Sequence, residues 1–223
     1  MYSVEVQTPP PAGPVTAAQL RARLRLNDSA EDDDLTELLA AAVDLFESDT
    51  NHPVLATVYR QYLSRWPYHD WWHQPGVGVV GSPPHVLVEG LHPDHPGRIV
   101  LGRGGLTAIA GVYRFLADGS TEALTGWVAD VQTPPARVQL AARPDQVVTA
   151  AGVPVSPVGY VEYTAGWDAS HVPPLVITAI KLLAAHWYSN REAYLEKSLA
   201  ELPAGWCRVT TKYRLGLSGD WGQ

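Results

Sequence analysis

The stretch Tyr160-Val-Glu-Tyr-Thr-Ala-Gly-Trp167, followed by an apolar run that reaches about Leu199, decides the fold of this chain. Its first half is rich in aromatic and β-branched residues, which are typical of a strand, and Gly166 ends that strand. Pro173 and Pro174 then stand where a helix can begin, because a proline in the first turn forfeits no helical hydrogen bond. The stretch therefore predicts a strand, a tight corner and a long helix.

The predicted helix has large side chains at steps of three and four, and neither glycine nor proline occurs between residues 175 and 199. The residues at this spacing are Val176, Ile180, Leu183, Trp187, Arg191 and Tyr194. Lys181 and Glu192 also fall within it, so the segment is too polar to span a membrane. We expect a core helix over residues 172–199.

Together with the residues that precede this helix, the pattern predicts an α+β protein with one domain over residues 1–223. Thr16 with Gln19 forms a capping-box pattern, which predicts a short helix. A second helix is expected to follow and to end near Asn51, because apolar residues recur there at helical spacing. They are Leu35, Leu38, Leu39, Ala42, Val43 and Phe46.

An antiparallel β region is expected over residues 54–165, with a loop excursion over residues 67–97 that is rich in proline, glycine and histidine. The turn Asp118-Gly119 marks a hairpin within it. The helix pair, residues 15–51, and the long C-terminal helix are expected to form a helical body into which this β region is inserted. Residues 203–223 are expected to be an extended C-terminal tail.

Several of these segments resemble the signature of head–tail connector (adaptor) proteins of tailed bacteriophages, a family also found in prophages and phage-derived gene transfer particles. The matching segments, in the family's order, are Tyr163-Thr-Ala-Gly-Trp167, Val172-Pro-Pro174 and Ala184-Ala-His-Trp-Tyr-Ser-Asn-Arg-Glu-Ala193. Pro14-Val-Thr16 and Asp32-Asp-Asp34 stand at the family's matching places near the N-terminus. The resemblance covers residues 8–66 and 98–195 and fails over residues 67–97.

The resemblance implies a structural virion protein and not an enzyme. It implies a homo-oligomeric ring, expected to be twelvefold, attached beneath the portal protein. Such a ring extends the DNA channel, through which DNA passes without specific binding, and offers a docking surface for the next neck or tail protein, a stopper or terminator. The implied location is the head–tail interface of a virion or phage-like particle, after synthesis in the host cytoplasm.

Two sets of residues are candidates for these contacts. The first lies on the predicted long helix and would join subunits of the ring: Trp187, Tyr188, Arg191 and Tyr194. The second lies in the tail, where basic residues alternate with large apolar ones, and would dock on the portal: Trp206, Arg208, Lys212, Tyr213, Arg214, Leu215, Leu217 and Trp221. The alternative for the tail is that it folds back on its own subunit.

Charge and cysteine content limit the other functions open to the chain. Residues 1–50 carry ten acidic and three basic residues, whereas the remaining residues carry thirteen of each, so the net charge of −7 belongs to the N-terminal part. An acidic surface argues against nucleic-acid binding as the main activity. The single cysteine, Cys207, rules out an intramolecular disulfide framework, and no base is placed to activate it as a nucleophile.

We expect no catalytic residue, cofactor or metal. His69 and His73, and the group His92, Asp94 and His95, could hold a metal, but the interpretation as an exposed loop is favoured because prolines bracket the first pair. The acidic run before the second helix is explained by helix capping, since it lacks the glycine of a calcium loop. The many tryptophans and tyrosines leave one alternative function, a carbohydrate-binding or host-recognition β module.

Overall fold

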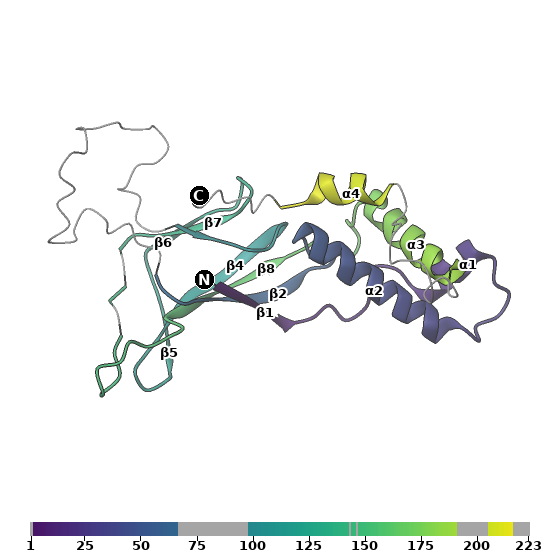
Figure 1. The fold of residues 1–223 in the computed structure, drawn as a ribbon. Helices are drawn as coiled ribbons and strands as arrows, with labels where there is room; N and C mark the ends of the chain where they lie inside the picture. Colours follow the sequence, from purple (N-terminus) through teal and green to yellow (C-terminus); the bar gives the residue numbers. More distant parts are fainter. Residues whose placement is uncertain (1, 67–97, 143, 146, 191–204, 216–223) are drawn as a thin grey trace, which may run out of the picture. The chain divides into compact units, whose positions relative to one another are not determined.

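The computed structural model describes residues 2–66, 98–142, 144–145, 147–190 and 205–215 (Figure 1). The helices in this part of the chain are α1 (Ala17–Leu24), α2 (Asp32–Thr50), α3 (Pro174–Ser189) and α4 (Trp206–Tyr213). The strands are β1 (Tyr2–Thr8), β2 (Thr57–Leu63), β3 (Arg98–Val100), β4 (Leu106–Phe115), β5 (Thr121–Ala123), β6 (Trp127–Asp130), β7 (Arg137–Leu140) and β8 (Gly159–Ala165). None of the described helices is both long and apolar enough to cross a lipid bilayer.

The strands form two sheets. One has five strands in the order β1-β2-β8-β4-β5, and the other has three in the order β3-β7-β6. The hairpin expected around Asp118-Gly119 is present: β4 pairs antiparallel with β5, with Tyr113 opposite Ala123. The second sheet is also antiparallel, with Val138 of β7 opposite Ile99 of β3 on one side and Ala129 of β6 on the other. The single β region expected from the sequence is therefore divided between two sheets.

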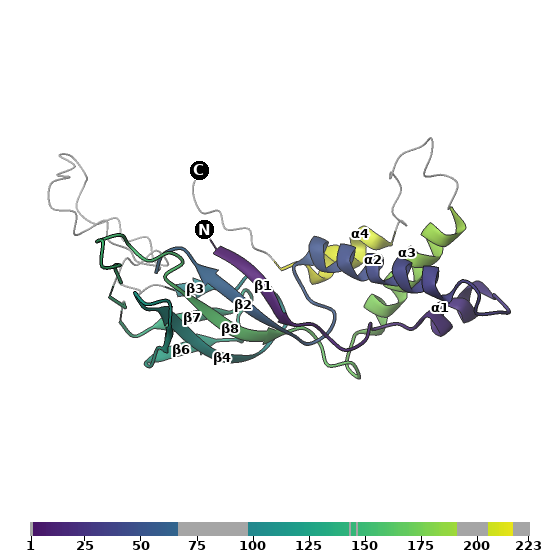
Figure 2. The same cartoon turned by 90° about the horizontal axis from the view of Figure 1, so that it is seen from below.

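The chain divides into two compact units. The β unit comprises Met1–Glu5, Arg60–Leu101 and Ala110–Glu162, and the helical unit comprises Val6–Tyr59, Gly102–Ile109 and Tyr163–Gln223. In the described part of the β unit, Ile99, Val112 and Val138 are buried. In the helical unit, α2 packs against α1, α3 and α4 (Figure 2).

The N-terminal helices form where the sequence places them. The Thr16 side chain accepts a hydrogen bond from the N–H of Gln19 at 3.3 Å and so caps α1. Arg25 ends α1 with a φ of 60°, and Asn51 ends α2 with a φ of 53°. Asparagine tolerates this left-handed conformation better than most residues, and it stops α2 at the expected position.

The expected fold class is wrong at its C-terminal part, because the long helix over 172–199 does not form. Helix α3 begins at Pro174, as the two prolines predict, but it ends at Ser189. Asn190 stops it: the Asn190 N–H donates to the carbonyls of His186 and Trp187, at 3.1 and 3.2 Å, and its side-chain amide donates to the His186 carbonyl at 2.7 Å. A side chain that bonds the last turn in this way competes with continuation of the helix.

The expected extended tail is also wrong, because its described part contains helix α4. The described helices are therefore short, and the mixed α/β architecture of four such helices and two antiparallel sheets replaces the expected body built on one long helix. Arg191 and Tyr194 lie outside the described residues, as do Leu217 and Trp221. The loop excursion over 67–97, with its histidines, also lies outside them.

Candidate assembly surfaces

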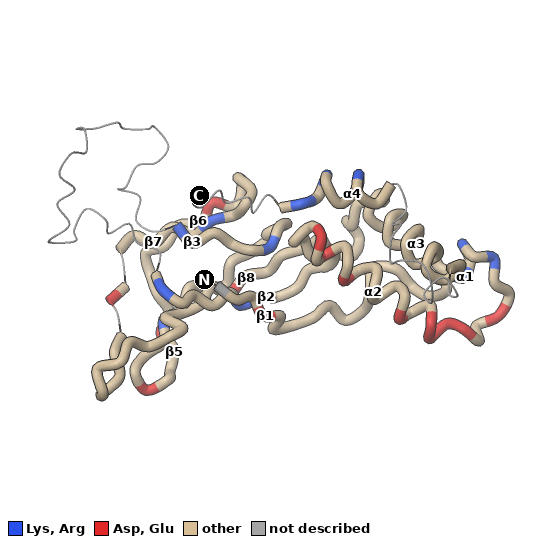
Figure 3. Tube along the Cα trace, in the orientation of Figure 1, with Lys and Arg blue, Asp and Glu red and all other residues tan. Residues whose placement is uncertain are grey.

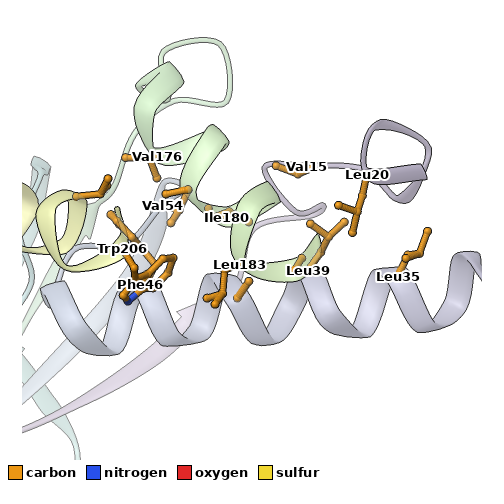
Figure 4. Close-up of a cluster of buried hydrophobic side chains, with 14 residues drawn as sticks. Val15, Leu20, Leu35, Leu39, Phe46, Val54, Val176, Ile180, Leu183 and Trp206 are labelled. Atoms are coloured by element: carbon orange, nitrogen blue, oxygen red, sulfur yellow. The ribbon is translucent and has the colours of Figure 1, made fainter. Parts of the chain in front are cut away.

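The apolar stripes of α2 and α3 face each other inside the helical unit. Leu35, Leu39 and Phe46 of α2 are buried together with Ile180 and Leu183 of α3 (Figure 4). Trp187 and Tyr188, the described members of the candidate subunit interface, are half-buried and pack against this core. The stripes that identified the helices are thus used for packing within the chain.

Trp206 of α4 belongs to the same core. Its side chain is only 2% exposed, and its ring meets that of Phe46 edge-on, with centroids 6.1 Å apart and an interplanar angle of 84°. The indole N–H donates to a carboxylate oxygen of Asp49 at 2.9 Å, so the buried polar group has a charged acceptor. Figure 4 shows Trp206 beside Phe46.

The residues after Trp206 also contact their own subunit. The Tyr213 ring lies edge-on to Trp167 at 5.5 Å, Arg214 Nε donates to the Asp49 carbonyl at 3.0 Å, and the Leu215 N–H donates to the Thr50 carbonyl at 2.7 Å. Leu215 is buried. Residues 206–215 therefore fold back on the end of α2, which is the alternative that the sequence left open for this segment. Arg208 and Lys212 point outward as exposed residues.

An apolar groove lies between α3 and α4. It has a volume of about 410 Å³. Leu175 and Leu182 of α3 line it and are 43% and 41% exposed, although leucine side chains of this size are usually covered. Ala179 and Val209 are buried at its base. The charged residues that line this groove in the described part of the chain, Arg208 and Lys212, are both basic.

The exposed face of α2 has the opposite charge. Asp33, Glu37 and Asp44 are exposed and stand at positions i, i+4 and i+11, which places them on one side of the helix. Ala40 lies between them on that side and is also exposed. Figure 3 shows acidic positions along α2 and basic positions on α4. We call Asp33, Glu37, Ala40 and Asp44 the α2 stripe.

A half-buried histidine, His52, joins the end of α2 to the corner after β8. The His52 ring stacks on Trp167, with centroids 3.9 Å apart and an interplanar angle of 20°, and its Nδ1–H donates to the Pro53 carbonyl at 2.9 Å. Gly105 allows the close approach, since a Cβ on it would lie 2.6 Å from the Nε2 atom of His52. Burial lowers the pKa of His52, and the hydrogen bond to Pro53 opposes this only in part. Sequence reasoning missed this site, because a single histidine gives no pattern.

The half-buried carboxyl group of Glu47 holds the adjoining connection. Glu47 Oε1 accepts the N–H of Val54 at 2.8 Å, which fixes the turn from α2 into β2. Burial raises the pKa of Glu47, while the Val54 hydrogen bond and the Arg103 guanidinium oppose the rise. The Arg103 guanidinium also lies over the Tyr59 ring, 5.4 Å from its centroid. These contacts stabilise the fold and place no nucleophile beside a base.

The pH dependence of the free energy of unfolding is expected to show the effect of His52. Because burial lowers its pKa, the folded protein binds fewer protons than the unfolded chain below the ordinary value of 6.5. The contribution of His52 to stability is therefore fully present above pH 6.5 and is lost as the pH decreases towards the lower pKa of the folded state. Urea unfolding at several pH values should show this fall in the wild type and a weaker one in His52→Gln. Equal curves for the wild type and His52→Gln would contradict the assignment.

The described aromatic residues are used mainly for internal packing. In the β unit, Tyr160 stacks on Tyr113 at 4.8 Å and also contacts Tyr62 and Phe115. In the helical unit, Tyr59 packs on Tyr163 at 5.8 Å. Tyr59, Tyr160 and Tyr163 are buried, so these rings offer no flat exposed face of the kind that binds a sugar. The described residues contain no group of three potential metal ligands, and the candidate histidines at 69, 73, 92 and 95 lie outside them.

No protein-family model and no curated protein matches this sequence. Solved structures do match the fold. A chain in the neck of an empty gene transfer agent (GTA) particle, computed with C6 symmetry, superposes with a TM-score of 0.69 at 20% identity over 95% of each chain. Chains in the virion of a native gene transfer agent particle and in the neck of a native GTA particle, computed with C12 symmetry, give TM-scores of 0.66 and 0.59. Both are 20% identical, over 95% of this chain and 94% of the other. This protein therefore has the fold of these particle chains along nearly its whole length.

Proposed function

We propose that this protein is a head–tail connector, or adaptor, in the neck of a phage-like particle. The observation that carries the proposal is the shared fold over 95% of the chain with proteins from gene transfer agent necks and virions. Independent support comes from the Tyr163–Trp167 segment and the segment ending α3, which resemble the connector signature. The role is structural, and no reaction is assigned to it.

In this role the whole chain, as one connector, forms a homo-oligomeric ring beneath the portal protein. The ring extends the DNA channel and presents a docking surface to the next neck or tail protein, a stopper or terminator. Two of the similar necks were computed with C6 and C12 symmetry, which supports a ring, and we propose twelve subunits. A net charge of −7 suits a channel that DNA passes through without adhering.

The residues that would contact the portal and the neighbouring subunits are also part of this proposal. Of the portal-docking residues suggested by the sequence, Arg208 and Lys212 are exposed and available to a partner, either the portal or a neighbouring copy of this chain. Trp206 and Leu215 are buried in their own subunit, so they support the docking surface from beneath. Leu217 and Trp221, which continue the segment, complete the proposed portal contact. Trp187, Tyr188, Arg191 and Tyr194 remain the candidates for contacts between neighbouring subunits near the end of α3.

Deletion of the gene from a strain that produces the particles tests this role. Without a connector, heads are expected to fill with DNA but to remain tail-less. The measured frequency of gene transfer or infection should therefore fall to about the background of the assay. Electron microscopy counts tailed and tail-less heads, and a plasmid copy of the gene is the control that restores tails. Normal tailed particles in the deletion strain, or location of the protein in tail fibres, would refute the proposal.

A further inference from the structure

The groove between α3 and α4 is built to receive an apolar surface with acidic edges. Leu175 and Leu182 leave about two fifths of their surface exposed, while Ala179 and Val209 form a shallow base. Arg208 and Lys212 stand one helical turn apart, about 6 Å along α4, on the same side of the groove. An occupant must therefore offer small apolar groups to the leucines and carboxylates to α4.

The α2 stripe offers these groups in this arrangement. Ala40 lies between Glu37 and Asp44, whose Cα atoms are separated by two turns, about 10 Å along the helix. Long arginine and lysine side chains can reach carboxylates over such a difference in spacing. A helix with alanine at its centre can also approach a groove closely, because no large side chain holds it away.

The stripe and the groove lie on different faces of one helical unit. The stripe is on the side of α2 away from Leu35, Leu39 and Phe46, which face the core. The groove is formed by residues of α3 and α4 next to their own core-facing residues, with Trp206 between the groove and Phe46. One copy therefore cannot fill its own groove with its own stripe, but a second copy can.

We propose that neighbouring copies of this chain join head to tail, with the α2 stripe of one copy seated in the α3–α4 groove of the next. This inference rests on the proposed function, because a ring requires one contact repeated between all copies. A contact between two different surfaces of the same chain closes into a ring when the rotation per subunit allows it, whereas a two-fold contact gives only a dimer. Opposite charges on the two surfaces also fix their order.

The test uses two charge-reversed forms of the full-length chain. The groove variant is R208E/K212E, and the stripe variant is E37K/D44K. All four residues are exposed, so circular dichroism melting curves should match the wild type. The matched control, R23E/R65E, makes the same charge change as the groove variant at exposed positions outside both surfaces.

Sedimentation velocity and native mass spectrometry at increasing concentration then measure self-association. The wild type and the control are expected to form closed rings, and each reversed variant alone should associate about a hundredfold more weakly. An equal mixture of the two variants should form rings again, because the acidic stripe of the groove variant fits the basic groove of the stripe variant, and the reversed pair also matches. Mass spectrometry should show equal numbers of the two forms in each ring.

Three results would overturn the inference: a wild type that stays monomeric to its solubility limit, variants that assemble as the wild type does, or a mixture that fails to assemble. Leu182→Asp provides a second variant, which should weaken association without any change at the basic residues. Variants that form normal rings but fail to attach to heads would mean that the groove binds another neck protein. Each of these results leaves the connector role intact, since gene deletion tests that role separately.

Discussion

Replacement of Trp206 by alanine is expected to lower the free energy of unfolding by about 3–5 kcal/mol, as for other buried tryptophans. The side chain is 2% exposed, and its removal would leave a cavity beside Phe46. It would also leave the Asp49 carboxylate without its indole donor at 2.9 Å. Ending the chain after Pro203 removes this contact together with Val209 and Leu215, and we expect that truncated chain to lack a cooperative unfolding transition.

Urea unfolding followed by circular dichroism measures this effect. Arg208→Ala is the matched control on the same helix, and its exposed side chain should change stability by less than about 0.5 kcal/mol. Trp206→Phe separates the contribution of packing from that of the hydrogen bond, because it retains most of the packing and removes the donor to Asp49. A Trp206→Ala protein with wild-type stability would show that α4 is not part of the core.

The C-terminal segment shows what sequence reasoning could not settle. From the sequence, residues 203–223 are expected to form an extended tail that docks on the portal, because Pro203 breaks regular structure. Folding back on the same subunit is the alternative. The spacing of Trp206, Val209 and Tyr213 is helical, but eight residues are too few for periodicity to outweigh the breaker. Its partners, Phe46 and Asp49, lie about 160 residues earlier in the chain, as the Trp206–Asp49 separation of 157 shows. Such long-range packing leaves no local pattern.

The prediction for the end of α3 was wrong for a different reason. Periodicity continued past Ser189 to Arg191 and Tyr194, so the apolar pattern favoured a longer helix. The stop depends on one side chain, the Asn190 amide, which bonds the His186 carbonyl at 2.7 Å. An asparagine within a helical pattern is compatible with either outcome, because its preference for capping is weak compared with the packing of a core.

Local signals with a clear physical cause were predicted correctly. The Thr16 cap and the turn at Gly119 each follow from the residues beside them. The capping role expected for the acidic run is not seen, because α2 begins after Glu31 without a side-chain cap hydrogen bond. The choice of strand partners does not, because β1 enters the five-stranded sheet beside β2, about fifty residues later. The groove could not be predicted for the same reason, since it needs α3 and α4 to be placed side by side.

Replacement of Gly166 by alanine is expected to destabilise the protein by about 3 kcal/mol or more, through two independent effects. Gly166 has a φ of +109°, which side-chain-bearing residues rarely adopt. A Cβ would also lie 2.6 Å from the Leu55 carbonyl carbon and closer still to its oxygen. The backbone there is held by hydrogen bonds, from the Ala56 N–H to the Trp167 carbonyl at 2.8 Å and from the Gly166 N–H to the Gly105 carbonyl at 2.9 Å.

Gly119→Ala separates the two effects. Gly119 has a φ of +84°, and a Cβ on it would meet no atom within 4 Å. This control should therefore cost only the conformational strain, about 1 kcal/mol. The difference between the two variants in urea unfolding measures the collision with Leu55. A difference near zero would mean that the Leu55 backbone moves aside freely. A large difference would explain why the corner after β8 requires glycine before Trp167: the strand must end where a second backbone segment passes within contact, so that Trp167 can stack on His52.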